Sequence, residues 1–170
     1  TRGMSSAASD VYKRQTIAIA EHNGPVYLRF GRPKVPNFTP ENQSFVIGKA
    51  ICLKEGKDVS IFATGHLVWE AMEAQKALEE QGISAEIINI HTIKPLDEKA
   101  ILKSVVKTKC VVSAEEHMLN GGLGDSIAQY LSRNNPTPIE MVGVNDKFGE
   151  SGKPKELMAK YELDSNSIVK

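Results

Sequence analysis

Two carboxylates and an imidazole stand next to one another at Glu115, Glu116 and His117, just before a glycine-rich run at residues 120–124. A carboxylate beside a histidine can orient the ring for proton transfer. Because successive side chains of an extended chain point to opposite sides, Glu115 and Glu116 cannot both face one pocket. Three uses of this cluster are therefore open: proton transfer, hydrogen bonds to the amides of the glycine-rich run, and contact with a neighbouring subunit.

The glycine-rich run contains Gly121, Gly122 and Gly124 and stands between a predicted strand and a predicted helix. Glycine allows a close approach of the backbone, and a helix N-terminus presents free N–H groups. Gly121 and Gly122 are therefore candidates for an anion site or for contact with a partner loop. The competing explanation is tight packing of the helix on the sheet. The run has neither the spacing of the dinucleotide-binding fingerprint nor the Lys-Ser/Thr pair of a phosphate-binding loop.

Arg32 follows a predicted strand at residues 26–30 and is flanked by Gly31 and Pro33. A guanidinium held at such a turn can bind a phosphate or a carboxylate through two N–H groups. The alternative is a solvent-exposed charge in a linker. Arg29, inside the predicted strand, is expected to form an ion pair.

Three further histidines lie at the ends of predicted elements. His66 could contact a ligand at the start of a helix or cap that helix. His91 precedes a loop at residues 92–95, beyond the end of a strand, and is a possible loop or interface site. His22 ends a helix, where a cation interacts favourably with the helix dipole. A structural role is the expectation for each, and none has the spacing of a metal ligand.

Trp69 is predicted on the polar face of a helix at residues 66–81, together with Glu73, Lys76 and Glu80. Exposed aromatic side chains are concentrated at interfaces, so this residue is a candidate contact with another chain or domain. An isolated exposed apolar residue is also common and is the alternative.

Strand and helix patterns alternate along the elements that carry these residues. We expect a three-layer α/β fold, with helices on both faces of a mostly parallel open sheet that has one antiparallel edge strand. The antiparallel pair is expected to be a hairpin of strands 49–54 and 59–63. The boundary signals are Gly82, Asp97, Pro154 and Asp164. Further strands are predicted at 85–89, 110–114 and 139–142, and further helices at 97–107, at 123–131, from 154 and from 164.

Composition divides the chain into four segments. Residues 1–15 are rich in Ser and Ala, lack helical or strand periodicity, and are interpreted as a sequence-junction artefact. Residues 16–32 are expected to be the tail of a preceding unit. Residues 33–43 contain three prolines and are expected to form a linker. Residues 44–170 form the main domain.

Lys plus Arg and Asp plus Glu each number 21, so no net field favours nucleic acid or an anionic membrane. No apolar run reaches the roughly 20 residues that span a bilayer, and the start has no signal-peptide pattern. Cys52 and Cys110 have no metal or redox spacing and are expected to be reduced, buried and structural. These features are typical of a cytoplasmic protein.

Four phrases, in this order, together resemble the C-terminal part of transketolase. They are residues 24–32 (Gly-Pro-Val-Tyr-Leu-Arg-Phe-Gly-Arg), 56–65 (Gly-Lys-Asp-Val-Ser-Ile-Phe-Ala-Thr-Gly), 92–97 (Thr-Ile-Lys-Pro-Leu-Asp), and the acidic cluster with its glycine-rich run. The resemblance covers residues 16–170. It implies that residues 16–32 are the tail of a pyrimidine-binding domain and that residues 44–170 are a transketolase C-terminal domain.

The resemblance implies a dimeric enzyme that moves a two-carbon ketol unit between sugar phosphates, using thiamine diphosphate and a divalent metal such as Mg²⁺. It also implies an N-terminal transketolase section or subunit as partner, and a role for Arg32 in binding the substrate phosphate. The sequence lacks the Gly-Asp-Gly…Asn motif that holds the metal and diphosphate in this family. The chain alone is therefore expected to bind no cofactor, to supply no catalytic residue and to serve mainly in assembly.

Other parents are compatible with the same phrases. Within the superfamily, the equivalent region of a 2-oxo acid dehydrogenase E1 β subunit or of deoxyxylulose-phosphate synthase is the alternative. Outside it, the chain could be a non-catalytic dimerisation module.

Overall fold

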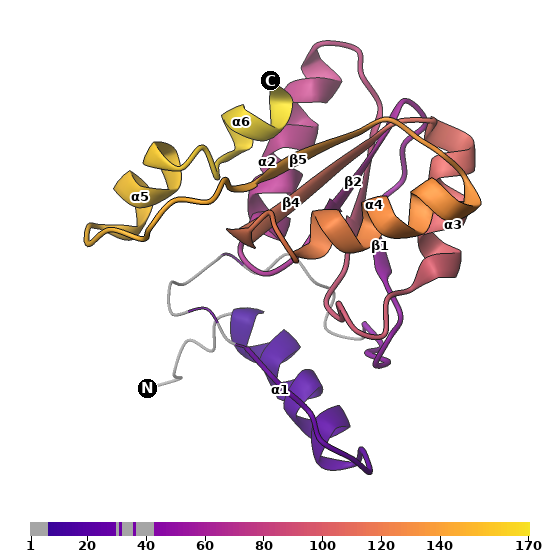
Figure 1. The fold of residues 1–170 in the computed structure, drawn as a ribbon, viewed down its shortest axis with the longest axis vertical. Helices are drawn as coiled ribbons and strands as arrows, with labels where there is room; N and C mark the ends of the chain where they lie inside the picture. The colour runs from indigo at the N-terminus through magenta and orange to yellow at the C-terminus, as the bar shows by residue number, and fades with distance from the viewer. Residues whose placement is uncertain (1–6, 30, 32–35, 37–42) are drawn as a thin grey trace.

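The computed structural model describes residues 7–29, 31, 36 and 43–170, with side chains from residue 13 onward. Five strands form one sheet in the order β1-β3-β2-β4-β5, and helices lie on both of its faces (Figure 1). The strands are β1 (Ile51–Lys54), β2 (Val59–Ala63), β3 (Ala85–Asn89), β4 (Val111–Met118) and β5 (Ile139–Val144). The helices are α1 (Ala7–Ala20), α2 (Leu67–Glu80), α3 (Glu98–Thr108), α4 (Leu123–Asn134), α5 (Pro154–Lys160) and α6 (Ser165–Val169).

The predicted fold class is confirmed. Strands β3, β2, β4 and β5 are parallel to one another. Strand β1 pairs antiparallel with β3 at one edge of the sheet. Helices α2 and α6 pack on one face, and α3 and α4 pack on the other.

The predicted hairpin between β1 and β2 is wrong, because β3 lies between these strands. The connection at residues 55–58 passes across the start of β3, where the N–H groups of Lys57 and Asp58 donate to the Ser84 carbonyl at 3.0 and 2.9 Å. Four residues can span about 13 Å, which exceeds the roughly 10 Å between alternate strands of a sheet. A short connection therefore does not require its two strands to pair.

Two apolar cores lie on opposite faces of the sheet because successive strand residues alternate between them. Ile61 of β2 belongs to the core under α2 and α6, and the next residue, Phe62, belongs to the core under α3 and α4. Both side chains are fully buried. The predicted apolar face of α2 is confirmed, with Met72 partly buried against the core residues Leu67, Val68, Ala71, Ala74 and Leu78.

The predicted boundary signals are also confirmed. Gly82 takes a φ of +79° just beyond α2, a conformation that costs glycine nothing. Asp97 caps α3 by accepting a hydrogen bond from the Ala100 amide at 3.2 Å. Pro154 is the first residue of α5, and Asp164 caps α6.

Two local predictions near the start of the chain are wrong. Residues 7–15 do form regular structure, because α1 begins at Ala7. Alanine, lysine, arginine and glutamine favour helix intrinsically, so this segment forms a helix without a marked apolar stripe. Residues 26–29 are not a strand, and residue 30 lies outside the described residues. A strand needs a neighbour for its N–H and C=O groups, and the described residues supply none there.

The two cysteines are free thiols, but the prediction that they are buried is wrong. Cys52 is exposed and Cys110 is half-buried. Cys52 lies on the edge strand β1, where alternate side chains face away from the core. Cys110 precedes β4 and follows Lys109, whose φ of +62° ends α3.

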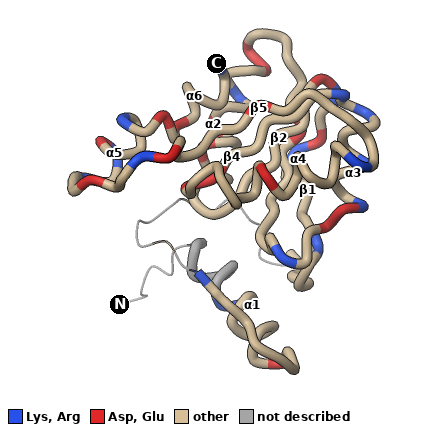
Figure 2. Tube along the Cα trace, viewed as in Figure 1, with Lys and Arg blue, Asp and Glu red and all other residues tan. Residues whose placement is uncertain are grey.

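No helix in the described part of the chain is both long enough and apolar enough to cross a lipid bilayer. Basic and acidic residues are interspersed along α5 and around α3 (Figure 2). This arrangement agrees with the equal numbers of acidic and basic residues in the sequence.

Candidate functional site

The carboxyl ends of β2 and β4 bring together three of the predicted site residues. These strands are adjacent and parallel, with Ala63 opposite Ala114. His66 follows β2 and directly precedes α2, while Glu116 and His117 lie in β4, which is longer than predicted. Residues at the carboxyl ends of neighbouring parallel strands lie side by side, and ligands of open α/β sheets bind there.

His66 and Glu116 are joined by a hydrogen bond of 2.8 Å between Nδ1 and Oε2. The hydrogen bond from His66 is the main cause that lowers the pKa of Glu116, against the effect of burial. The carboxylate is therefore charged and can only accept, so Nδ1 of His66 carries the hydrogen. The His66 side chain, 8% exposed, makes no hydrogen bond that caps α2. The capping alternative is therefore wrong.

His117 lies next to Arg29, with 2.8 Å between Nε2 of His117 and Nη1 of Arg29. Burial is the main cause that lowers the pKa of His117, and the Arg29 charge lowers it further while Glu116 opposes both. A neutral imidazole can accept a hydrogen bond from a guanidinium. Arg29 was expected to form an ion pair; among the described residues its hydrogen-bond partner is this histidine.

Gly31 lies directly against the His66 ring. A Cβ at Gly31 would come within 2.2 Å of both Cε1 and Nε2 of His66, so only glycine fits without a displacement. The segment that precedes the main domain therefore reaches the carboxyl ends of β2 and β4 at Arg29 and Gly31. Arg32, the predicted phosphate ligand, lies outside the described residues.

Glu115 points away from Glu116, toward α4, as alternation along a strand predicts. It is fully buried, and its two oxygens accept hydrogen bonds from the amides of Leu123 at 2.7 Å and Gly124 at 2.9 Å. Burial raises the pKa of Glu115, and the two amides oppose this effect. A Cβ at Gly122 would lie 2.3 Å from the carboxylate. The amides at the start of α4 therefore bind the chain's own carboxylate.

Gly121 forms the turn that leads into α4. Its φ of +77° is a conformation that L side chains rarely adopt. Its N–H donates to Oδ2 of Asp125 at 2.6 Å. This contact and the close approach at Gly122 agree with the alternative explanation of the glycine-rich run, tight packing of the helix on the sheet.

His91 lies beyond the carboxyl end of β3, at the same end of the parallel strands as His66 and Glu116. Its ring packs on Phe45 with 4.3 Å between the ring centroids, and Nδ1 is 2.9 Å from Oγ1 of Thr92. Burial lowers the pKa of His91 to about 4. A general base at neutral pH works best with a pKa near 7, so this ring is suited to packing rather than to proton transfer.

Trp69 is half-buried in the first turn of α2. The ammonium of Lys76 lies 5.7 Å from its ring centroid, and Lys76 also pairs with Glu73 at 2.6 Å. The predicted grouping of these three residues on one helix face is confirmed.

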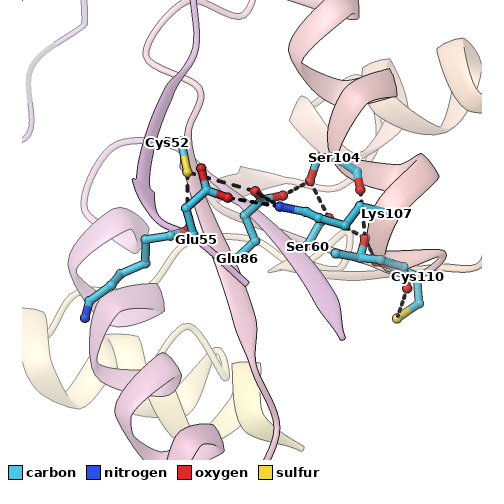
Figure 3. A network of polar contacts seen from close by, with 9 residues as sticks. Cys52, Glu55, Ser60, Glu86, Ser104, Lys107 and Cys110 are labelled. Carbon is cyan, nitrogen blue, oxygen red and sulfur yellow. Dashed lines mark hydrogen bonds and ion pairs between the residues drawn. The ribbon is translucent and has the colours of Figure 1, made fainter. Parts of the chain in front are cut away.

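A second polar cluster lies at the other end of these strands, where β2 and β3 begin (Figure 3). Glu86, 4% exposed, is 2.5 Å from the ammonium of Lys107 and accepts a hydrogen bond from Ser104. Lys107 also contacts Glu55 at 3.0 Å. No predicted site residue lies in this cluster. The available signal was Glu86, the one acidic residue of β3.

Cys52, Glu55 and Glu86 place one thiol and two carboxylates with ligand atoms within 4.8 Å of one another. A cysteine ligates metals as the thiolate. Burial, and then the charges of Glu55 and Glu86, raise the pKa of Cys52 to about 11, which opposes that form. Lys107 already supplies a positive charge to both carboxylates. These residues fit a lysine-centred ion-pair cluster better than a metal centre.

Comparison with known proteins identifies relatives among transketolases. The profile of the family described as "Transketolase, C-terminal domain" matches residues 48–168. The 6-deoxy-6-sulfo-D-fructose transketolase subunit of Clostridium sp. (strain MSTE9) is 47% identical over 152 residues, covering 89% of this chain and 47% of that protein. A Methanocaldococcus jannaschii protein described as a transketolase C-terminal section is 42% identical over 169 residues, covering 96% of this chain and 52% of its own length.

The same similarity extends to a second enzyme class and to a solved structure. The 1-deoxy-D-xylulose-5-phosphate synthase of Halothermothrix orenii is 38% identical over 149 residues, covering 85% of this chain and 23% of the synthase. A solved structure described as a split gene transketolase, inactive beta4 tetramer, superposes with a TM-score of 0.87 at 44% identity. The match covers 92% of this chain and 52% of that chain. The chain thus spans about half the length of the transketolase relatives it matches.

Proposed function

The chain belongs to the transketolase C-terminal domain family, and from this membership we propose that it is the C-terminal section of a split transketolase. The observation that carries the proposal is its similarity, along most of its length, to transketolase subunits and sections about twice as long. The parent enzyme would transfer a two-carbon ketol unit between sugar phosphates. Its partner would be an N-terminal transketolase section or subunit, in a cytoplasmic homodimer of the complete unit.

In this proposal the chain serves mainly in assembly and is inactive alone. Thiamine diphosphate and Mg²⁺ would be held by the remaining polypeptide, because this sequence lacks the Gly-Asp-Gly…Asn motif of the family. The hydrogen bonds and the pKa of the titratable residues support this division of roles between the two polypeptides. Glu115 is engaged by the amides of α4, His91 is neutral with a pKa of about 4, and Glu116 is bonded to His66.

Residues 16–32 are proposed as the tail of the pyrimidine-binding domain, residues 33–43 as a linker, and residues 44–170 as the C-terminal domain. The contacts of Arg29 and Gly31 with His117 and His66 support this arrangement, since they join the first segment to the third.

The test is the reaction of the complete parent enzyme. Ketol transfer from xylulose 5-phosphate, or from 6-deoxy-6-sulfo-D-fructose as named for one relative, would support the proposal. Formation of 1-deoxy-D-xylulose 5-phosphate would instead identify a deoxyxylulose-phosphate synthase, the alternative favoured by the similarity to that enzyme. Oxidative decarboxylation of a 2-oxo acid would identify a dehydrogenase component. Tight binding of thiamine diphosphate by this chain alone would contradict the proposed division of labour.

We expect Arg32→Ala in the complete enzyme to raise KM for phosphorylated sugars by about 10- to 100-fold, because a charge-assisted contact to a phosphate is lost. KM for an unphosphorylated acceptor aldehyde should not change. Steady-state kinetics with both acceptors measure the difference. Arg133→Ala, which removes an exposed arginine from the last turn of α4, is the matched control. An unchanged KM for phosphorylated sugars would remove the proposed role of Arg32.

Trp69 is proposed as a contact with another chain of the complete assembly. Trp69→Ala should raise the dissociation constant of the assembly about 30-fold, the effect of removing a central aromatic contact. Trp69→Phe should recover most of the loss. Sedimentation equilibrium measures both. Val106→Ala, which trims an exposed apolar residue of α3 on the other face of the sheet, should change nothing. Equal sedimentation of Trp69→Ala and the native protein would leave Trp69 as an ordinary surface residue.

A further inference from the structure

The main chain at Gly31 and the ring of His66 are in direct contact, although these residues belong to different segments of the chain. The contact distance of 2.2 Å that a Cβ at Gly31 would make with Cε1 and Nε2 leaves no room for a side chain. His66 therefore sets how closely the backbone at Gly31 can approach the ends of β2 and β4.

The His66 ring is itself held in place. Its side chain is 8% exposed, and its Nδ1 donates to the charged Glu116 at 2.8 Å. His66 has helical backbone angles, with φ −66° and ψ −27°, immediately before α2. The ring is thus anchored by a helix start on one side and by a residue of β4 on the other.

We propose that His66, oriented by Glu116, is a positioning residue for substrate-phosphate binding in the parent enzyme. It acts on the main chain at Gly31, the residue that precedes Arg32 in the sequence. The proposal rests on the proposed function, in which Arg32 binds the phosphate. His66 and Glu116 need not touch the substrate, since they act on the main chain at Gly31.

A guanidinium on a long side chain loses conformational freedom when it binds a phosphate, and a fixed backbone reduces that loss. Loosening the contact at Gly31 should therefore weaken the binding of phosphorylated substrates. The chemical step takes place elsewhere in the enzyme, so kcat should be nearly unchanged.

The first test is steady-state kinetics of the complete enzyme with Glu116→Ala and Glu116→Gln. Glu116→Ala removes the acceptor of His66 and should raise KM for phosphorylated sugars about tenfold, with kcat within twofold of the native value. Glu116→Gln retains an acceptor oxygen and should restore KM to within about threefold. KM for an unphosphorylated acceptor aldehyde should stay the same in both variants.

The second test is a double-mutant cycle between Gly31 and His66. Gly31→Ala alone places a methyl group against the ring and should raise KM for phosphorylated sugars about tenfold. His66→Ala alone should raise it similarly, because the support is lost. The double variant makes room for the methyl group, so its KM should be clearly below the product of the two single effects. Strict multiplication of the effects would show that the two residues do not act together.

Failure of this inference and failure of the proposed function give different results. If Arg32→Ala raises KM for phosphorylated sugars but Glu116→Ala and His66→Ala do not, the positioning role is wrong and the phosphate role of Arg32 stands. If Arg32→Ala has no effect, the phosphate role of Arg32 is wrong and this inference fails with it. If the complete enzyme performs no ketol transfer, the proposed function itself is wrong. Equal losses with phosphorylated and unphosphorylated acceptors would indicate general misfolding and would overturn the positioning role.

Discussion

Replacing Glu115 with alanine should lower the free energy of unfolding of the chain by about 3 kcal/mol, because two buried amides lose their acceptor. The carboxylate is fully buried in the native protein and accepts hydrogen bonds from Leu123 and Gly124. Its charge also stabilises the N-terminus of α4, where the helix dipole is positive. Urea unfolding of the whole chain, followed by far-UV circular dichroism, measures the change.

Two further variants separate the causes of this loss. Glu115→Gln has nearly the same shape, but its amide group presents one donor toward the α4 amides and should therefore remain strongly destabilising. Glu140→Ala removes an exposed carboxylate from the edge strand β5 and should change stability by less than about 0.5 kcal/mol. A Glu115→Ala variant as stable as the Glu140→Ala control would show that the glycine-rich run does not depend on this carboxylate.

The sequence predicts the elements of this fold well where the signal is local. The buried strand at 85–89 and the apolar face of α2 follow from periodicity. Asp97, Pro154 and Gly82 mark helix boundaries through their own backbone and side-chain chemistry, and all three do so in the structure. Each of these signals acts within a few residues, so one sequence is enough to read it.

Pairing across the sheet does not follow from local sequence signals. The four residues between β1 and β2 are compatible with a hairpin and also with a connection across β3, and only the second occurs. The same holds for the orientation of the acidic pair. Alternation places Glu115 and Glu116 on opposite faces, but it does not indicate which one meets α4. That choice depends on the packing of whole helices.

The candidate site shows the same limit. His66, Glu116 and His117 can be recognised in the sequence as ionisable residues at the ends of predicted elements. Their proximity, however, follows from β2 and β4 being neighbours in the sheet. The ion-pair cluster of Glu86 and Lys107 joins a strand to a helix 21 positions further along the chain. No spacing rule marks such a pair in advance.

Gly56→Ala is expected to be among the most destabilising single substitutions in the domain, lowering the free energy of unfolding by about 3 kcal/mol. A Cβ at Gly56 would lie 2.2 Å from the Ala85 carbonyl carbon and from the Glu86 nitrogen. These are backbone atoms of β3, so no change of rotamer can relieve the overlap. The connection would have to lift away from β3, which weakens the hydrogen bonds from Lys57 and Asp58 to Ser84.

Urea unfolding compares Gly56→Ala with two other glycine substitutions that lower the entropy of the unfolded chain equally. Gly149→Ala has no atom within 4 Å of the new Cβ and no unusual φ, so it should be neutral or stabilising by up to about 1 kcal/mol. Gly82→Ala also meets open space, but its φ of +79° should cost about 1 kcal/mol. The predicted order of stability is therefore Gly149→Ala, Gly82→Ala, then Gly56→Ala. A Gly56→Ala variant as stable as Gly82→Ala would show that the connection can leave β3 at little cost and that its close packing on this strand contributes little to stability.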